Sequence, residues 1–108
     1  MTTHIGRQLK ILDEVLHERD AQDAIFGVQD LPHGTGDEWM GAMAHVSRRE
    51  CDEAFAAGSG TFRHVFLEEV YEAVAEDDPV KLRAELMQAI AVGVKWVEAI
   101  DRAGEEAP

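Results

Sequence analysis

FLEEVYEAVAEDDPVKLRAELMQ, residues 66–88, predicts two helices joined by a short acidic turn. Each residue of an α-helix rotates by about 100°, so side chains three or four positions apart share one face. Glu69 and Glu72 therefore point the same way on the first helix. Glu85 and Gln88 repeat this spacing on the second helix. Helices joined by so short a connection are usually antiparallel neighbours, so we expect the two polar pairs to face each other.

A solvated acidic surface is the simplest interpretation of the acids between Glu68 and Asp78, since most charged side chains face water. Two features favour a metal site instead. Glu69 and Glu72 share their face with apolar residues, and Glu85 does the same on its own helix. These apolar neighbours are Phe62, Val65, Phe66 and Ala73 on the first helix, and Leu82, Ala89, Val92 and Trp96 on the second. A carboxylate in such a setting needs a proton, a basic partner or a cation, and converging carboxylates favour Mg²⁺ or Mn²⁺.

The length of 108 residues predicts a single helical domain over residues 1–108. No apolar run reaches the ~18 residues of a membrane span, and the start MTTHIGRQLK lacks the apolar core of a signal peptide. Cys51 is the only cysteine, so no internal disulfide can form, and a small buried side chain is a commoner role for it than catalysis. A cytoplasmic location is expected.

The net charge is −12, from 10 Lys and Arg against 22 Asp and Glu. Such a chain is repelled by phosphate backbones and by anionic lipid, so we expect neither a nucleic-acid polymer nor a membrane as a partner. A small anionic ligand is compatible with this charge if a metal or a few basic residues offset the local field. The candidates for phosphate contact are Arg48, Arg49, Lys81, Arg83 and Lys95, although a solubilising role at the surface is the simpler one for most of them.

Helical periodicity runs along the chain, without convincing strand alternation. The expected helices cover residues of about 3–24, 37–57, 61–76 and 79–103, and a frayed tail is expected over about 104–108. Glycine-rich breaks at 27–36 and 58–60 separate the first three helices. The expected caps are Asp37 (or Thr35 paired with Glu38), Thr61, and Asp78 followed by Pro79.

Apolar stripes on the first and fourth helices are expected to be buried. They comprise Ile5, Leu9, Leu12 and Leu16 on the first, and Leu82, Leu86, Ile90, Gly93, Val97 and Ile100 on the fourth. The apolar positions of the second helix include Trp39, Met43, Val46, Ala54 and Phe55. The fourth helix is apolar around much of its circumference, which indicates burial on several sides. We therefore expect an all-α, four-helix bundle completed by oligomerisation, most simply as a two-fold dimer.

Polar and aromatic residues outside the acidic stretch have two open interpretations each. Residues 18–30 gather amides and acids around Phe26, which fits either a binding role or an ordered helix end. His64 is either a group that supports the acidic site or a surface histidine. Tyr71 and Trp96 fit stacking on a base, but core packing is the simpler role for both.

The segments Glu68-Glu69-Val70-Tyr71-Glu72 and Glu85-Leu86-Met87-Gln88 together resemble the MazG-like nucleotide pyrophosphohydrolases. The pattern of that family is Glu-Glu-x-x-Glu followed, after a short gap, by Glu-x-x-Asp. The flanks ERDAQDAIFGVQD and LMQAIAVGVKWVEAIDR are similar to those of a subgroup of short, single-domain members from bacteria and phages. The first motif alone is weakly specific, but combined with the second motif and the flanks it is fairly specific.

This resemblance implies a usually oligomeric, MazG-like bundle that splits a nucleoside triphosphate, or a related nucleotide, into a monophosphate and pyrophosphate. The residues implied to be catalytic are Glu68, Glu69, Glu72 and Glu85, and the implied Mg²⁺ (or Mn²⁺) ligands are Glu69, Glu72, Glu85 and Gln88. The candidate substrate contacts are Arg19, Gln22, Asp23, Phe26, Lys81 and Trp96.

Gln88 departs from the family pattern, because it stands where the family has an aspartate. A neutral amide can bind a metal only through its carbonyl oxygen, and one negative charge is missing from the site. This departure keeps a second hypothesis open, in which the chain is a non-catalytic nucleotide-binding or protein-interaction module. The three glutamates favour the enzyme, and Gln88 favours the module.

Overall fold

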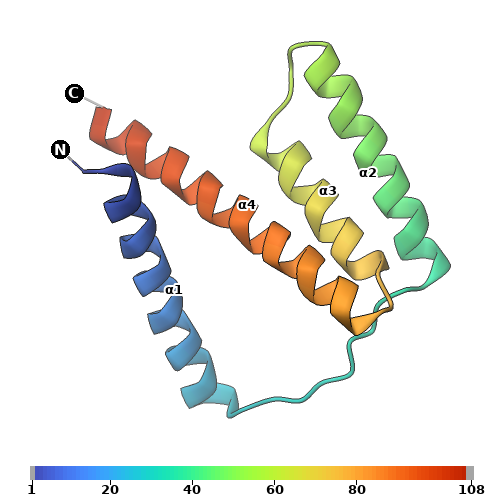
Figure 1. Cartoon of the computed structure of the whole chain (residues 1–108), viewed down its shortest axis with the longest axis horizontal. Coiled ribbons are helices and arrows are strands. Elements are labelled where there is room, and N and C mark those ends of the chain that lie inside the picture. Colours follow the sequence, from blue (N-terminus) through green and yellow to red (C-terminus); the bar gives the residue numbers. More distant parts are fainter. Residues whose placement is uncertain (1, 107–108) are drawn as a thin grey trace. The chain divides into compact units, whose positions relative to one another are not determined.

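A computed structural model describes residues 2–106, and these form an all-α fold (Figure 1). The helices are α1 (His4–Phe26), α2 (Glu38–Ala56), α3 (Phe62–Ala75) and α4 (Pro79–Glu106). All four expected helices are present, and the described residues contain no strand. None of these helices has an apolar stretch long enough to cross a lipid bilayer.

Two helix ends lie beyond their expected positions. The first helix continues past Ala24 to Phe26, and Gly27 ends it with a positive φ of 70°. The fourth helix continues through residues 104–106, where the sequence predicted the start of a frayed tail. The rest of that expected tail, residues 107 and 108, lies outside the described part of the chain. Glu105 and Glu106 have good intrinsic helix propensity, which is compatible with their helical conformation.

The starts of α2 and α4 are fixed by the predicted aspartate caps. Asp37 accepts a hydrogen bond from the Met40 N–H at 2.8 Å. Asp78 does the same for the Lys81 N–H at 3.0 Å, and Pro79 occupies the first position of α4. Each cap satisfies a backbone donor that the first helical turn leaves without a partner.

The start of α3 carries a reciprocal cap that gives His64 a structural role. The Thr61 hydroxyl accepts from the His64 backbone N–H at 3.3 Å, and the Thr61 backbone N–H donates to His64 Nδ1 at 3.2 Å. This is a capping box with histidine in the place usually taken by Glu or Gln.

The chain divides into two compact units. One comprises residues 1–32 and 94–108, and the other comprises residues 33–93. The second unit contains α2, α3 and the first part of α4. Within it, α2 and α3 pack against each other along antiparallel paths (Figure 1). Its buried side chains are Ser47 and Cys51 on α2, Ala73 on α3, and Leu82 and Ala89 on α4.

The loop that leads into α2 is attached to the end of α3. The Gly36 N–H donates to the Val74 carbonyl oxygen at 2.9 Å. Gly36 has a φ of 89°, and a Cβ built on it would lie 2.7 Å from the Cβ of Asp77. Only glycine combines this backbone conformation with so close an approach. The entrance to α2 and the turn between α3 and α4 are therefore held together.

The first unit buries charged residues as well as apolar ones. Arg7 and Ile11 on α1 are buried, and Arg7 forms an ion pair with Glu105. Glu98 is also buried, with a side chain only 6% exposed and one oxygen 3.7 Å from His4 Nδ1. Buried charges are tolerated where an opposite charge or a hydrogen-bonding group lies close by.

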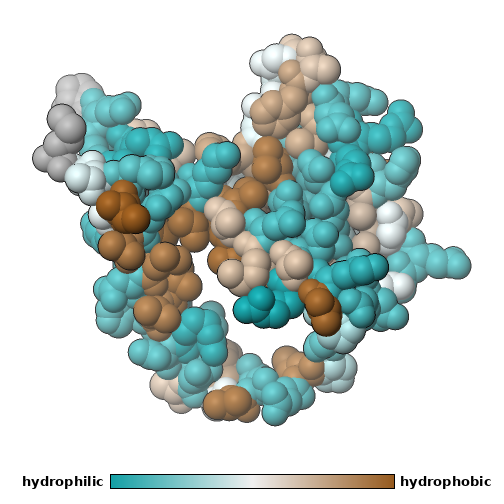
Figure 2. Space-filling model, viewed as in Figure 1, coloured by the Kyte–Doolittle hydropathy of each residue, from teal (hydrophilic) through white to brown (hydrophobic). Residues whose placement is uncertain are grey.

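The apolar stripe predicted to be buried on α1 is exposed instead. The exposed fractions are 65% for Ile5, 61% for Leu9, 45% for Leu12 and 64% for Leu16, and Figure 2 shows apolar side chains on the surface of this helix. The buried residues Arg7 and Ile11 lie on the opposite side of α1. Among the described residues of its own unit, this stripe is therefore largely uncovered.

Much of the apolar stripe predicted to be buried on α4 is also exposed. Leu82 is buried as expected and Gly93 is half-buried, but Leu86, Ile90, Val97 and Ile100 are exposed. Of the apolar positions on α2, Met43 and Ala54 are half-buried, and Trp39, Val46 and Phe55 are exposed. A short all-helical chain has too few helices to bury every apolar helix face against another helix.

Candidate metal centre

Three glutamates from two helices converge in the second unit. Glu69 and Glu72 on α3 and Glu85 on α4 each offer one carboxylate oxygen, and these oxygens lie within 4.8 Å of one another. The spacing of three residues puts Glu69 and Glu72 on one face of α3. A short turn joins α3 to α4 (Figure 1), and Glu85 on α4 converges with them. We refer to Glu69, Glu72 and Glu85 as the glutamate triad.

The position of Glu85 on α4 explains why its charge is poorly solvated. Leu82 and Ala89, about one helical turn to either side, are both buried. Glu85 therefore lies on the side of α4 that faces the interior of this unit, and it is half-buried like Glu69 and Glu72. A carboxylate in such a position loses part of its hydration.

Two oxygens of the triad have no hydrogen-bond partner. Glu69 Oε2 and Glu85 Oε2 are both buried and accept no hydrogen bond from the protein. An acceptor that is removed from water without replacement costs free energy, and more so when it is charged. A cation bound between the helices would satisfy both oxygens.

The pKa values of Glu69 and Glu72 show the same electrostatic stress. Burial raises the pKa of Glu69, and the negative charges of Glu72, Glu68 and Glu85 raise it further. Burial also raises the pKa of Glu72, although the positive charge of Arg48 opposes this shift. Each group holds its proton more tightly than an isolated glutamate, because ionisation adds negative charge to a crowded site.

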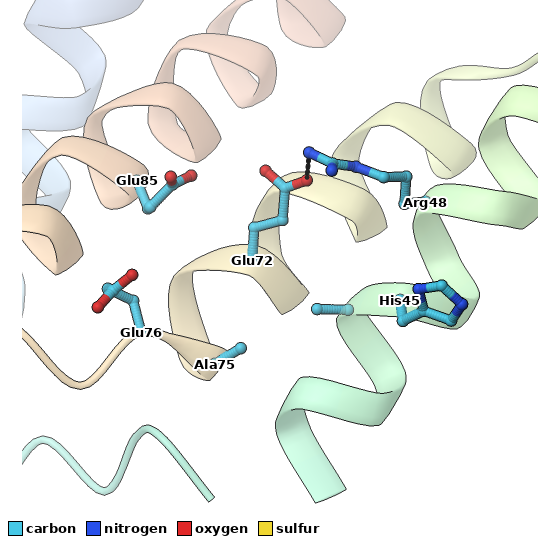
Figure 3. Close-up of a pocket in the computed structure, with 7 residues that line it drawn as sticks. His45, Arg48, Glu72, Ala75, Glu76 and Glu85 are labelled. Atoms are coloured by element: carbon cyan, nitrogen blue, oxygen red, sulfur yellow. Dashed lines mark hydrogen bonds and ion pairs between the residues drawn. The ribbon is translucent and has the colours of Figure 1, made fainter. Parts of the chain in front are cut away.

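Arg48 on α2 is the basic residue in contact with this group. Its Nη2 donates a hydrogen bond to Glu72 Oε1 at 2.9 Å (Figure 3), and its Nε lies 3.7 Å from Glu68 Oε1. The Glu72 carboxylate raises the pKa of Arg48. In the sequence, Arg48 is one of several basic candidates without a distinguishing mark. Only the packing of α2 against α3 brings it to the acidic residues.

A cavity of about 370 Å³ opens beside the triad. Its walls are formed by Ala44, His45 and Arg48 on α2, by Glu72, Ala75 and Glu76 at the end of α3, and by Glu85 on α4 (Figure 3). The ring of His45 points away from Glu72 in this view. The volume is within the range of sites for small molecules. The cavity gives a ligand access to Arg48 and to two members of the triad at once.

Glu68 and Gln88, the other residues of the predicted acidic site, lie beside the triad in sequence but have different surroundings. Glu68 is half-buried and interacts with Arg48 and with Cys51. Burial, with smaller effects from Glu68, raises the pKa of Cys51 to about 11, so the thiol is not an activated nucleophile. Gln88 is exposed, one turn after Glu85 on α4.

The predicted substrate contacts are divided between the two units. Arg19 on α1 donates to Gln22 at 2.9 Å and to Asp23 at 3.1 Å. These three residues, the exposed Phe26 and the half-buried Trp96 belong to the first unit. Lys81 is exposed in the first turn of α4, in the unit that contains the triad.

Comparisons of the chain with models of protein families, with curated proteins and with solved structures gave no match. The chemistry of the triad therefore has to be argued from its own atoms. Three carboxylate oxygens within 4.8 Å are hard donors, and one buried oxygen each of Glu69 and Glu85 lacks a hydrogen-bond partner. This donor set fits Mg²⁺ or Mn²⁺, which take oxygen ligands, and it lacks the sulfur and imidazole that zinc prefers.

Proposed function

We propose that this chain is a Mg²⁺- or Mn²⁺-dependent, MazG-like pyrophosphohydrolase that converts a nucleoside triphosphate to a monophosphate and pyrophosphate. The observation that carries the proposal is the convergence of Glu69, Glu72 and Glu85 within 4.8 Å. The unsatisfied oxygens of Glu69 and Glu85 support a cation there. The substrate class comes from the resemblance of the two acidic motifs to that family.

The residues of the triad are suited to hold a cation with little rearrangement. Glu69 and Glu72 project from one face of a regular helix, and Glu85 comes from the helix that follows directly. Glu68 adds negative charge next to them and raises the pKa of both Glu69 and Glu72. When bound, a divalent cation supplies charge neutralisation for phosphate oxygens and lowers the pKa of a bound water. The protein's part is to position the carboxylates and to limit their hydration.

The cavity beside the triad is the proposed position of the triphosphate. Arg48, Glu72 and Glu85 are among the residues that line it. The net charge of −12 disfavours binding of a polyanion unless cations screen the site. A metal at the triad together with Arg48 would provide this local positive charge, and nucleotide binding should therefore require the metal.

A second copy of the chain is the proposed cover for the exposed apolar stripe of α1. Ile5, Leu9, Leu12 and Leu16 form one continuous face on a regular helix. Burying four large aliphatic side chains on an α-helix is strongly favourable in water, and a two-fold axis lets the same stripe cover itself. A homodimer or a higher homo-oligomer is therefore the proposed assembly.

The second candidate is the same site without turnover. Gln88 favours it, because an exposed neutral amide replaces the carboxylate of the family pattern. A non-catalytic nucleotide-binding or protein-interaction module would keep the triad and the cavity but leave nucleotides intact. The two candidates differ in product formation and agree on metal binding.

Pyrophosphate release tests the proposal. The full chain is incubated with each (d)NTP and with Mg²⁺ or Mn²⁺, and pyrophosphate, phosphate and nucleotides are quantified. We expect a monophosphate and pyrophosphate in equal amounts, and loss of both when Glu69, Glu72 and Glu85 are replaced together by Gln. Nucleotide binding without product supports the non-catalytic module. Inorganic phosphate as the first product contradicts cleavage between the α and β phosphates.

A further inference from the structure

Arg48 is bound to the group of acids that the proposed metal would occupy. Its guanidinium donates to Glu72 at 2.9 Å and lies 3.7 Å from Glu68. Arg48 comes from α2, whereas the triad comes from α3 and α4. The guanidinium therefore acts as the counter-ion of these carboxylates in the metal-free protein.

The ion pairs of Arg48 contribute little to folding stability, so stability alone does not explain an arginine at this position. The side chain is 63% exposed, and exposed ion pairs contribute little to folding stability because solvent screens them. α2 and α3 pack against each other independently of this side chain, and Ser47 and Cys51 of α2 and Ala73 of α3 are buried. Removing the guanidinium should leave this packing intact.

A guanidinium and a divalent cation compete for Glu72. Arginine stays protonated at any pH at which proteins are folded, so Arg48 cannot relieve the repulsion by losing its proton. Either Arg48 moves away from Glu72 when a metal binds, or the metal binds more weakly because Arg48 stays. Its exposure and its long side chain permit the movement.

The cavity offers Arg48 a second partner. Arg48 lines the cavity together with Glu72 and Glu85, so a ligand there is within reach of its guanidinium (Figure 3). The planar fork of donors matches two oxygens of a phosphate group, and such charge-assisted contacts are stronger than neutral hydrogen bonds. A phosphate in this cavity would meet positive charge from Arg48 and from the metal.

We infer that Arg48 exchanges partners during ligand binding, releasing Glu72 when the metal enters and then binding the phosphate groups of the nucleotide. This inference rests on the proposed function and adds to it a residue that couples the metal to the substrate. In the metal-free protein the guanidinium of Arg48 is paired with carboxylates, so it is not available to bind an anionic ligand. The order of binding is then metal first and nucleotide second.

The first test measures how the Arg48→Gln substitution changes two affinities, one for Mn²⁺ and one for pyrophosphate. Without nucleotide, Mn²⁺ binding by electron paramagnetic resonance should tighten by about two- to fivefold, the worth of one exposed ion pair. With saturating Mn²⁺, binding of inorganic pyrophosphate by calorimetry should weaken by about tenfold, the worth of one charge-assisted contact. Opposite changes in the two affinities distinguish a shared residue from a purely structural one.

The matched control is Arg49→Gln. Arg49 is the next residue on α2, and it pairs with Glu53 on its own helix at 3.5 Å rather than with α3. We expect both affinities of this variant to equal those of the wild type. Arg48→Lys keeps the positive charge, so it should bind Mn²⁺ as weakly as the wild type does. Its pyrophosphate affinity should lie between those of Arg48→Gln and the wild type, because an ammonium lacks the planar fork of donors.

A second measurement follows the guanidinium directly and does not depend on turnover. Titration with Mg²⁺ alone should move the Nε–Hε resonance of Arg48 in NMR spectra and leave that of Arg49 in place. The inference is wrong if the wild type binds Mn²⁺ while Arg48→Gln changes neither affinity, or if the Arg48 resonance does not respond to saturating Mg²⁺. If the wild type binds no Mn²⁺ at all, the proposed function and this inference fail together.

Discussion

Glu69 on α3 and Glu85 on α4 belong to one group of converging carboxylates, and each has a buried oxygen that accepts no hydrogen bond. Two unpaired carboxylates in this arrangement repel each other and have lost part of their hydration. The metal-free protein therefore carries a local strain that a cation would remove. Stability and metal binding should respond in opposite directions when either charge is deleted.

The Glu85→Gln variant tests this opposition. We expect its metal-free form to gain roughly 1 kcal/mol in free energy of unfolding, because an uncompensated charge is removed, which corresponds to about 4–8 °C in Tm. Its Mn²⁺ affinity should fall. Thermal melts with and without Mn²⁺ measure both effects. Glu106→Gln, at an exposed position on the same helix, should change neither. A less stable metal-free Glu85→Gln would contradict the strain.

The raised pKa of Glu69 predicts a pH-dependent stability. The folded protein binds the Glu69 proton more tightly than the unfolded chain does, so ionisation destabilises the fold above this raised pKa. The penalty disappears as the pH falls through the raised pKa to the ordinary pKa of glutamate. Glu69→Gln should therefore be more stable than the wild type at about pH 7, and this advantage should shrink towards about pH 4. Urea unfolding of both proteins, without metal, measures the difference.

Metal should reverse the order of these two proteins. With Mn²⁺ present near pH 7, the wild type should be the more stable one, because only it has the full set of ligands. If the difference in free energy of unfolding between the wild type and Glu69→Gln does not change with pH, the ionisation of Glu69 does not destabilise the fold.

Gln88→Asp tests whether this position faces the metal. Gln88 follows Glu85 by one turn on α4, and an added carboxylate there would restore the charge of the family pattern. We expect tighter Mn²⁺ binding and faster pyrophosphate release, since charge-assisted contacts are about twice as strong as neutral ones. Gln88→Asn has the same length as Asp and no charge, so it should show neither gain. Identical behaviour of the Asp and Asn variants would place Gln88 outside the metal site.

The exposed stripe of α1 predicts self-association that one charge can disrupt. Light scattering should give at least twice the chain mass of 12.0 kDa. Leu9→Glu should shift the mass towards the monomer, because Leu9 is 61% exposed within the chain and its replacement leaves the interior unchanged. Circular dichroism should show that helicity is retained. A wild type of 12 kDa at micromolar concentration would contradict the proposed assembly.

The helix starts could be predicted because capping is a local interaction. Asp37, Thr61 and Asp78 each bind a backbone N–H three residues ahead, and this geometry is contained in the sequence itself. The convergence of the triad was predictable for a similar reason. Its members are related by helical spacing and by one short turn, so no distant part of the chain is involved.

The covered faces of the helices were not predictable in this way. The most apolar side of α1 was expected to be buried, but Arg7 and Ile11, on the other side, are the buried residues. Periodicity shows that a helix has an apolar face and does not show which molecule covers it. Arg48 was not distinguished for a related reason. Its pairing with Glu72 joins residues from two helices, and it depends on how α2 packs on α3.

The triad also depends on Gly36, a residue that contacts no proposed ligand. Any larger residue there would press on Asp77, in the turn that orients α4 and hence Glu85. Mutational tolerance should therefore be as low at position 36 as at the triad itself. In a library of single substitutions selected for Mn²⁺ binding, position 36 should accept glycine alone, while Gly41, whose added Cβ would meet only open space, should vary freely.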